Sequence, residues 1–302
     1  MRILLLSRNA ALYSTSRLVL AGRARRHDVD VVDPLELSIV VARGRPALCY
    51  AGCRLPRYDV VIPRIGATVT RYALSVLREL EESGAIMLNG ADAVARARDK
   101  VRSLQLLTRE RLRVPRTVCM RNVAGLEATL ELVGGCPVVV KLPNGTQGIG
   151  TMLVESEASL LALLETLWAM GQDVVLQEYV RESDGRDIRA FVVGGRVVAS
   201  MRRRAARGEF RSNLHRGAHA EPVALSKRYE KCALTATRAL GLEVAGVDIL
   251  EGKAGPVVVE VNSSPGLEGI ESASSIDIAT AIIALAETRA RRRTNGRAQA
   301  WC

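Results

Sequence analysis

Acidic and amide side chains interrupt two otherwise apolar stretches near the end of the chain. Asp248 lies in the first stretch, and Glu260 and Asn262 lie in the second. A buried carboxylate is costly unless it is paired or binds a metal ion. If the two stretches form a hairpin whose loop spans residues 252–256, Asp248 lies opposite Glu260 and Asn262 shares their face.

Three oxygen ligands on one face suit Mg²⁺, which keeps water and phosphate oxygens in its remaining positions. The absence of sulfur and imidazole ligands argues against zinc. A half-exposed sheet with polar side chains facing water would show a similar alternation. However, Ser263-Ser264-Pro265-Gly266 follows at once and is typical of a loop. The pattern therefore predicts a metal site.

A lysine beside a glycine-rich run is the second chemical signal. Lys141 lies in the apolar run 138–142, and Gly145, Gly148 and Gly150 follow. Glycines let backbone N–H groups approach phosphate oxygens, and the lysine supplies positive charge. The run lacks the Gly-Lys-Ser/Thr of a Walker A loop. Phosphate binding is one interpretation, and a hairpin turn with a solvent-facing lysine is the other.

Other polar residues could contact a nucleotide or an acidic substrate. Glu178 lies in the stretch 174–180 and could face an adenine, although the stretch also fits an ordinary strand. Arg211, Ser212 and Asn213 open a polar stretch suited to contact ATP or an acidic substrate.

Two alternating runs flank Gly194-Gly195 and predict a hairpin. If the two glycines are the whole turn, Arg189 faces Ser200 and Arg203 points to the other side of the sheet. A bulge would reverse this relation, so the register leaves open which arginine is functional. Solvated arginines on an edge hairpin are the alternative.

The composition limits the classes of function. The chain has 302 residues, of which 48% are hydrophobic, and a net charge of +11, which favours anionic partners. Aromatic residues make up only 3%, which leaves little for base-stacking platforms. The six cysteines form no Cys-x-x-Cys pair and indicate a reducing compartment. Apolar runs are too short for a signal peptide or a membrane helix, so we expect a cytoplasmic protein.

The N-terminal elements predict a doubly wound α/β domain over residues 1–95, since strands and helices alternate. The first strand is not followed by Gly-x-Gly-x-x-Gly, which argues against a dinucleotide site. The expected strands are 3–6, 29–32, 60–63 and 86–88, with helices around 16–26 and 69–83.

The rest of the chain predicts an α+β body. A helix is expected over 99–111, capped by Asp99. The expected strands are 138–142, 174–180, 188–193, 196–202, 246–251 and 257–262, and the expected helices are 157–170, 226–241 and 276–288. The Arg-rich segment 289–302 is predicted to be disordered.

Together these motifs resemble the ATP-grasp ligases, and among them the RimK family of ribosomal-protein glutamate ligases. The resemblance covers nearly the whole chain through the order and spacing of short motifs. They are DVVIPRIG (59–66), ARARDK (95–100), VVVKLPNGTQGIG (138–150), QEYV (177–180), DIRAFVVG (187–194), FRSNLHRG (210–217), AGVDIL (245–250) and EVNSSPGLEGIE (260–271).

The resemblance implies an ATP-grasp fold preceded by a pre-ATP-grasp domain. The expected units are 1–95 for the N-terminal α/β domain, 96–175 for the central subdomain, 176–288 for the C-terminal subdomain with the metal site, and 289–302 for a basic tail. The implied ligands are ATP and two Mg²⁺ or Mn²⁺ ions.

The resemblance also implies roles for individual residues. Arg203 matches the family's arginine near the acyl-phosphate, and Arg189 is a candidate for binding the substrate carboxylate. The remaining roles are Lys100 and Lys141 at the triphosphate, Gly145 and Gly148 in the loop over the phosphates, Glu178 and Tyr179 at the adenine, Asp187 near the ribose, Arg211, Ser212 and Asn213 along the nucleotide, and Asp248, Glu260 and Asn262 at the metal ions.

The implied reaction adds L-glutamate to the C-terminal carboxylate of small-subunit ribosomal protein six through an acyl-phosphate. We expect a homo-oligomer, dimeric or tetrameric, that needs neither a membrane nor direct nucleic-acid contact. The alternatives are an ATP-grasp ligase for another peptide, carrier protein or deazaflavin cofactor, a kinase, and a basic RNA- or ribosome-associated protein without enzymatic activity.

Overall fold

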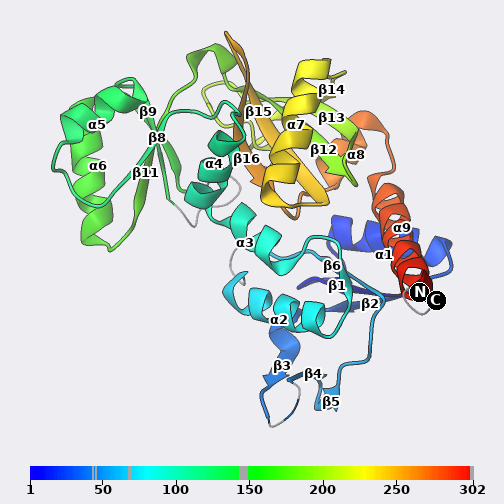
Figure 1. Cartoon of the computed structure of the whole chain (residues 1–302). Coiled ribbons are helices and arrows are strands. Elements are labelled where there is room, and N and C mark those ends of the chain that lie inside the picture. The colour runs from blue at the N-terminus through cyan, green and yellow to red at the C-terminus, as the bar shows by residue number, and fades with distance from the viewer. Residues whose placement is uncertain (43, 45, 67–69, 143–148, 300–302) are drawn as a thin grey trace.

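The computed structural model describes residues 1–302 except 43, 45, 67–69, 143–148 and 300–302. The described residues form four sheets. Three of them belong to the N-terminal, central and C-terminal units that follow one another along the chain, and the fourth is a small arm on the N-terminal unit (Figure 1).

The N-terminal unit is a parallel sheet in the order β2-β1-β6-β7, as the alternation of strands and helices predicts. One face packs against α1 and the C-terminal helix α9 (Ile278–Gln299), and the other against α2 and α3. Its elements are β1 (Arg2–Leu6), α1 (Tyr13–Ala24), β2 (Asp28–Val32), β6 (Val60–Pro63), α2 (Thr70–Glu82), β7 (Ile86–Met87) and α3 (Ala91–Arg98).

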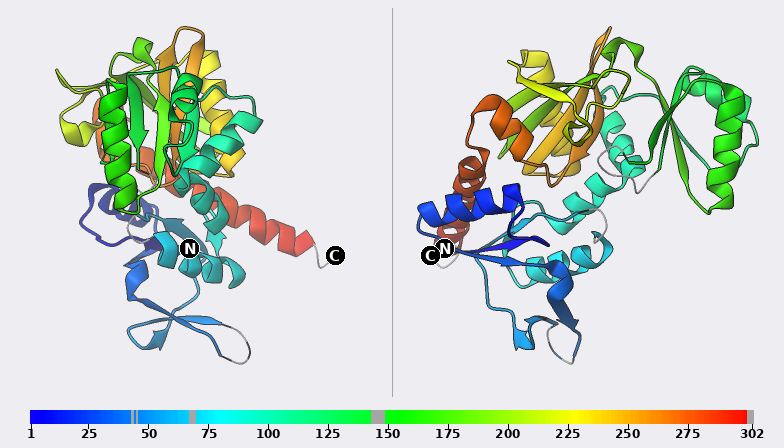
Figure 2. Two further views of the ribbon diagram at one scale, coloured as in Figure 1. Left: turned by 90° about the vertical axis from the view of Figure 1, so that its left-hand side faces the viewer. Right: turned by 180° about the vertical axis from the view of Figure 1, so that it is seen from behind.

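The arm is a three-stranded antiparallel sheet inserted between β2 and β6. It projects away from the other units (Figure 2). Its strands are β3 (Leu37–Val40), β4 (Ala47–Tyr50) and β5 (Cys53–Arg54). Among the arm residues that the structure describes, only Leu37 and Leu48 are buried, so the arm adds little to the core.

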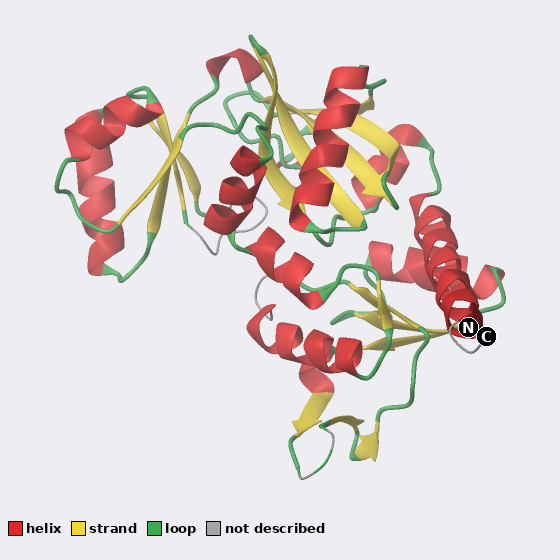
Figure 3. Cartoon of the chain, viewed as in Figure 1, coloured by secondary structure: helices red, strands yellow, loops and turns green. Residues whose placement is uncertain are grey.

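The central unit is an antiparallel sheet in the order β10-β9-β11-β8. Its two helices lie on one side of the sheet (Figure 3) and bury a cluster of Leu and Val side chains there. The elements are β8 (Thr117–Met120), α5 (Leu126–Val133), β9 (Val138–Lys141), β10 (Thr151–Val154), α6 (Glu157–Ala169) and β11 (Val174–Glu178).

The C-terminal unit is an antiparallel sheet in the order β14-β13-β12-β15-β16. Helices α4 (Lys100–Arg109) and α7 cover one part of it, and α8 and α9 join it to the N-terminal unit. Its elements are β12 (Arg186–Val193), β13 (Arg196–Arg204), β14 (His219–Pro222), α7 (Lys227–Leu240), β15 (Val244–Gly252), β16 (Gly255–Asn262), α8 (Glu268–Ser274) and α9 (Ile278–Gln299).

Two expected boundaries differ from the structure. The division between residues 175 and 176 falls inside β11, which belongs wholly to the central sheet. Helix α4 (Lys100–Arg109), expected in the central unit, packs against α7 and β16 instead. Its apolar face, which includes Leu107, completes the core of the C-terminal unit. Asp99 caps α4 as predicted, because its Oδ1 accepts a hydrogen bond from the Arg102 N–H at 2.9 Å.

The Arg-rich end is helical up to Gln299, so the prediction of a disordered tail was wrong for the described residues. Helix α9 continues beyond its buried apolar residues because two arginines find partners. Arg289 pairs with Glu243 at 2.8 Å, and Arg293 donates to the carbonyl oxygen of Gly84.

Asn89 joins the N-terminal and C-terminal units. Its side chain is buried and makes four hydrogen bonds of 2.7–3.1 Å to backbone groups of Glu243, Val244 and Ser263. The last of these residues directly follows the predicted metal ligand Asn262. Asn89 therefore helps to hold the end of β16 against the N-terminal unit.

Among the described residues, no single helix has the length and hydropathy to cross a membrane. Helix α8 and residues 278–293 of α9 meet that criterion only together, as a pair bent by 110°.

Candidate functional site

A row of charged side chains crosses one face of the C-terminal sheet. Arg189 on β12 lies opposite Asp248 on β15, and Asp248 lies opposite Glu260 on β16. Asn262 follows Glu260 on the same face, opposite Gly246. The predicted cross-strand pair of Asp248 and Glu260 is therefore confirmed.

The hairpin that forms this pair differs from the expected one. Its turn consists of Lys253 and Ala254 rather than five residues, because Gly252 pairs directly with Gly255. A shift in register between Asp248 and Ile249 then adds one residue on β16. The bulge compensates for the shorter turn, so that the two carboxylates still meet.

A second bulge decides whether Arg189 and Arg203 lie on the same face of the sheet, which the sequence left open. The register shifts between Phe191 and Val192, so Arg189 lies opposite Met201 and Asp187 opposite Arg203. Arg189 and Arg203 therefore share one face of the sheet. Arg202 lies on the other face, where it pairs with Glu221 and Glu251.

Asp248 is held by two guanidinium groups. Arg189 donates to both of its carboxylate oxygens at 2.7 Å, and Nη2 of Arg203 lies 3.1 Å from Oδ2. Burial raises the pKa of Asp248, but Arg189 and Arg203 outweigh it and lower the pKa to about 2. Arg203 is only 2% exposed and also binds Asp187 through two hydrogen bonds. Asp248 is thus ionised at neutral pH.

Glu260 contrasts with Asp248. It is exposed, and its carboxylate makes no hydrogen bond or ion pair with the described residues. It nevertheless lines a cavity with Lys100 and Lys141, where burial lowers the pKa of both lysines and the charge of Glu260 partly opposes this. Glu260 is therefore the carboxylate that faces the cavity.

The cavity lies between the central and C-terminal units. Lys141 enters it from β9, and its Nζ donates to Oε1 of Gln177 at 2.6 Å. Burial lowers the pKa of Lys141 to about 8, although Glu260 counteracts this. Burial also lowers the pKa of Lys100. The cavity is lined by Ala97, Lys100, Ser103, Leu104, Lys141, Val175, Gln177, Val259 and Glu260.

The remaining predicted nucleotide residues that the structure describes lie outside the lining of this cavity. Glu178 ends β11 and accepts hydrogen bonds from the backbone and side chain of Arg116 at 3.1–3.2 Å. Burial raises the pKa of Glu178, but these bonds outweigh it and the net pKa is lowered. Tyr179 is the next residue in the chain and is half-buried. Asp187 lies on β12 and accepts hydrogen bonds from Arg203.

Arg211 lies beside the strand that follows the glycine loop. Its Nη1 donates to the Thr151 carbonyl oxygen at 3.0 Å, and Glu209 binds its Nε and Nη2. Arg211 lowers the pKa of Glu209 to about 2. Ser212 and Asn213 follow Arg211 and are half-buried. Gly145 and Gly148 lie outside the described residues.

Three polar residues that bind predicted site residues were missed from the sequence. Gln177 is buried in an apolar strand, a signal that could have been noticed beside Glu178. Arg116 and Glu209 were not predictable in the same way, because their partners are set by strand pairing and loop path.

The oxygen ligands fit a hard divalent ion. Within the described residues, no group of three His, Cys, Asp or Glu side chains is placed to hold a metal. Two carboxylates with the Asn262 amide do provide an all-oxygen set, and Mg²⁺ commonly completes such a set with substrate phosphates. Oδ1 of Asp248 has one guanidinium donor and keeps a second lone pair, whereas Oδ2 lies beside both Arg189 and Arg203.

Comparisons with known proteins cover nearly the whole chain. Residues 1–94 match the RimK PreATP-grasp domain, and residues 97–286 match the RimK-like ATP-grasp domain. A probable alpha-L-glutamate ligase of Vibrio vulnificus is 47% identical over 300 residues, covering 98% of this chain and 100% of the relative. A protein of the same name from Saccharophagus degradans is 48% identical over 291 residues, covering 96% and 97%.

Solved structures show the same fold at low sequence identity. The ATP-grasp ligase PsnB, complexed with a phosphomimetic variant of minimal precursor, Mg and ADP, has a TM-score of 0.72 at 22% identity and covers 95% of this chain and 97% of its own. The D-alanine–D-alanine ligase of Bacillus anthracis, complexed with ATP, has a TM-score of 0.71 at 17% identity, covering 98% and 99%.

Proposed function

The chain belongs to the RimK family of ATP-grasp ligases, and from this premise we propose that it adds L-glutamate to the C-terminal carboxylate of small-subunit ribosomal protein six. An ATP-dependent ligase activity follows from the family itself. Glutamate is supported by the name of the relatives that are 47–48% identical. The ribosomal acceptor is the finer part of the proposal.

One observation carries the proposal: the charged row Arg189–Asp248–Glu260 ends at the cavity that contains Lys141. A carboxylate reacts poorly with an amine because its oxygen is a poor leaving group. Activation requires phosphoryl transfer, and this depends on positioning and on neutralising negative charge. Cationic side chains and oxygen ligands for a metal ion lie together at this cavity.

In the first step, a carboxylate oxygen of the acceptor attacks the γ-phosphorus of ATP. The bond to ADP breaks, and an acyl-phosphate forms. Lys100 and Lys141 stabilise the phosphate charge from the cavity wall. Mg²⁺ or Mn²⁺, two ions by family resemblance, would be held by Asp248, Glu260 and Asn262 and would neutralise further phosphate charge.

In the second step, the glutamate amine attacks the acyl carbon. The new C–N bond forms, the bond to phosphate breaks, and the amine loses a proton. Arg203 is proposed to stabilise the tetrahedral oxyanion. Arg189 orients Asp248 by its two hydrogen bonds. Its predicted contact with a substrate carboxylate stays a prediction, since these two donors already bind Asp248.

Purified protein with ATP, Mg²⁺, glutamate and the ribosomal protein tests the proposal. We expect ADP release that requires both glutamate and acceptor, and an acceptor mass increased by whole glutamate residues. ADP release without glutamate would contradict the ligase assignment. Glutamate added to another peptide, with the ribosomal protein unchanged, would support the ligase assignment but contradict the proposed acceptor.

ATP binding should depend on pH through Lys141. Its pKa of about 8 means that the free protein loses this positive charge as the pH rises through 8. We therefore expect the association constant for ATP to fall above about pH 8, approaching about tenfold per pH unit. Calorimetric titration with Mg-ATP between about pH 7 and about pH 9.5 measures it.

The matched control for this prediction is Lys141→Gln. It should bind ATP more weakly at neutral pH and show a flatter dependence, because its side chain does not titrate. An association constant for the unsubstituted protein that is constant over this range would contradict the proposed role of Lys141.

A further inference from the structure

Two arginines meet where the N-terminal unit faces the charged row. Arg64 directly follows β6, and its Nη2 donates to the carbonyl oxygen of Pro265 at 2.7 Å. Arg98 ends α3, and its Nη2 donates to the Ile65 carbonyl oxygen. Within the described residues, neither guanidinium has a carboxylate within ion-pair distance. The Nε of Arg98 is buried and has no hydrogen-bond partner there.

The positive charges of the two arginines repel one another. Burial and, after it, repulsion from Arg98 lower the pKa of Arg64 to about 10. Burial also lowers the pKa of Arg98, and the charge of Glu260 opposes this. Glu260 has the same effect on Lys100 and Lys141. Glu260 thus partly compensates the charges of three cationic groups, and Arg64 is repelled by one of them, Arg98, so an anion at the arginines would relieve repulsion.

The position of Arg64 connects it to the reaction site. It lies at the carboxyl end of a parallel strand, where α/β sheets bind ligands. Pro265, its hydrogen-bond partner, packs over Gly246: a Cβ at Gly246 would lie 2.8 Å from Pro265 and 3.8 Å from Cδ of Arg189. Arg64 is therefore separated from the charged row by a single proline.

The arginines on the sheet are already bound to acids. Arg189 and Arg203 donate to Asp248 and Asp187, whereas Arg64 and Arg98 use backbone carbonyl oxygens and keep further donors. A guanidinium matches the planar fork of a carboxylate. In the proposed reaction, the amino acid brings carboxylates that do not react and whose charge must be compensated.

We propose that Arg64 and Arg98 form a subsite that binds a carboxylate of the amino-acid substrate and directs its amine toward the charged row. The inference rests on the proposed function, and it assigns the amino acid to the interface of the N-terminal and C-terminal units.

Steady-state kinetics of Arg64→Gln and Arg98→Gln test the subsite. We expect the KM for glutamate to rise about tenfold or more, because a site built for a charged group loses a donor. The KM for ATP should stay within about twofold, because the phosphate-binding lysines are unchanged. Arg202→Gln is the matched control, since Arg202 lies on the opposite face of the sheet with Glu221 and Glu251.

Substrate analogues separate recognition from folding. Glutamine lacks the side-chain carboxylate, and glutamate α-amide lacks the other one. The unsubstituted protein should prefer glutamate over both analogues. In each arginine variant, the preference for glutamate over one of the two analogues should fall about tenfold. A misfolded variant would lose turnover with every substrate and keep the ratio.

The outcomes are distinct. Glutamate-independent ADP release by the unsubstituted protein would overturn the proposed function. Glutamate-dependent release, with unchanged KM and unchanged analogue preference in both arginine variants, would overturn only the subsite. Arg64→Lys, which keeps the charge but not the fork, should lie between the Gln variant and the unsubstituted protein.

Discussion

Replacing Glu260 by glutamine should lower the turnover number about a thousandfold while leaving stability unchanged. Glu260 is exposed and makes no hydrogen bond or ion pair with the described residues, so its attraction to nearby cations is screened by solvent and contributes little to the stability of the fold. In the proposed mechanism, however, it is the carboxylate that faces the cavity with Lys100 and Lys141. ADP release at saturating ATP and glutamate, with urea unfolding in parallel, measures both effects.

Two further variants serve as a control and a comparison for Glu260→Gln. Glu251→Gln changes a carboxylate of the same hairpin that pairs with Arg202 on the other face, and it should keep its turnover number within about twofold. Asp248→Asn should lose both activity and stability, because Arg189 and Arg203 would keep their buried charges without their partner. A Glu260→Gln protein with more than about a tenth of normal turnover would contradict the proposed metal site.

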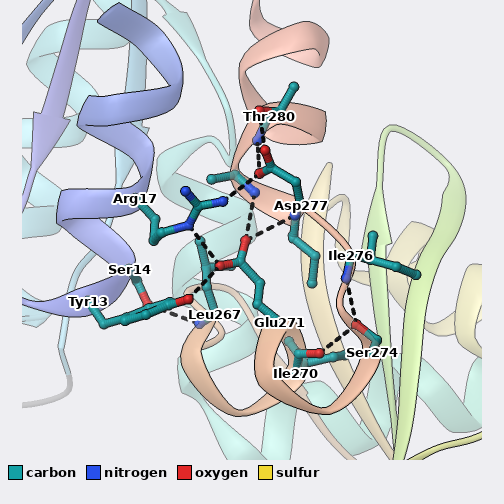
Figure 4. Close-up of polar contacts among 12 residues, drawn as sticks. Tyr13, Ser14, Arg17, Leu267, Ile270, Glu271, Ser274, Ile276, Asp277 and Thr280 are labelled. Carbon is teal, nitrogen blue, oxygen red and sulfur yellow. Dashed lines mark hydrogen bonds and ion pairs between the residues drawn. The ribbon is translucent and has the colours of Figure 1, made fainter. Parts of the chain in front are cut away.

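Replacing Glu271 by alanine should cost about 3–5 kcal/mol of unfolding free energy. Glu271 on α8 is 8% exposed, and its carboxylate accepts four hydrogen bonds of 3.0–3.1 Å (Figure 4). Tyr13 and Arg17 donate from α1, and the backbone N–H groups of Ile278 and Ala279 donate from the start of α9. Alanine would leave the two buried backbone donors without an acceptor and would remove the shared partner of Tyr13 and Arg17.

Urea unfolding followed by circular dichroism measures this loss. Asp277→Asn is the matched control, because Asp277 also binds Arg17 but its side chain is 52% exposed, and we expect a loss of less than about 1 kcal/mol. Glu271→Gln keeps one acceptor oxygen and should fall between the two. Equal unfolding free energies for the alanine variant and the unsubstituted protein would show that the cluster does not hold α1 to α8 and α9.

The periodicity of the chain was sufficient for the fold class and for most elements. Strands such as Ile3–Leu6 and Val138–Lys141 are short apolar runs, and the predicted cap of α4 by Asp99 is a local hydrogen bond. These features depend on neighbours within a few residues, which a single sequence displays directly. The acidic residues in the last hairpin were recognisable for the same reason, because charges in apolar strands require an explanation.

The register of the paired strands could be predicted from the sequence only in part. The pairing of Asp248 with Glu260 was predicted, but through a five-residue loop, whereas the structure uses a two-residue turn and a bulge. The bulge near Phe191 placed Arg189 and Arg203 on one face, which the sequence had left open. A bulge moves every later side chain to the other face, and its position depends on packing rather than on local preference.

Contacts between distant segments were decided by tertiary structure alone. Arg64 lies at Pro265, Lys141 at Gln177 and Glu178 at Arg116, although at least 36 residues separate each pair. The Arg-rich end is helical because Arg289 and Arg293 find partners on other elements. Residue types and their spacing thus determined which chemical groups the chain carries. The packing of the three units determined which charges are neutralised within the protein and which remain available to a substrate. The reason is that burial and ion pairing arise only once the units are packed together.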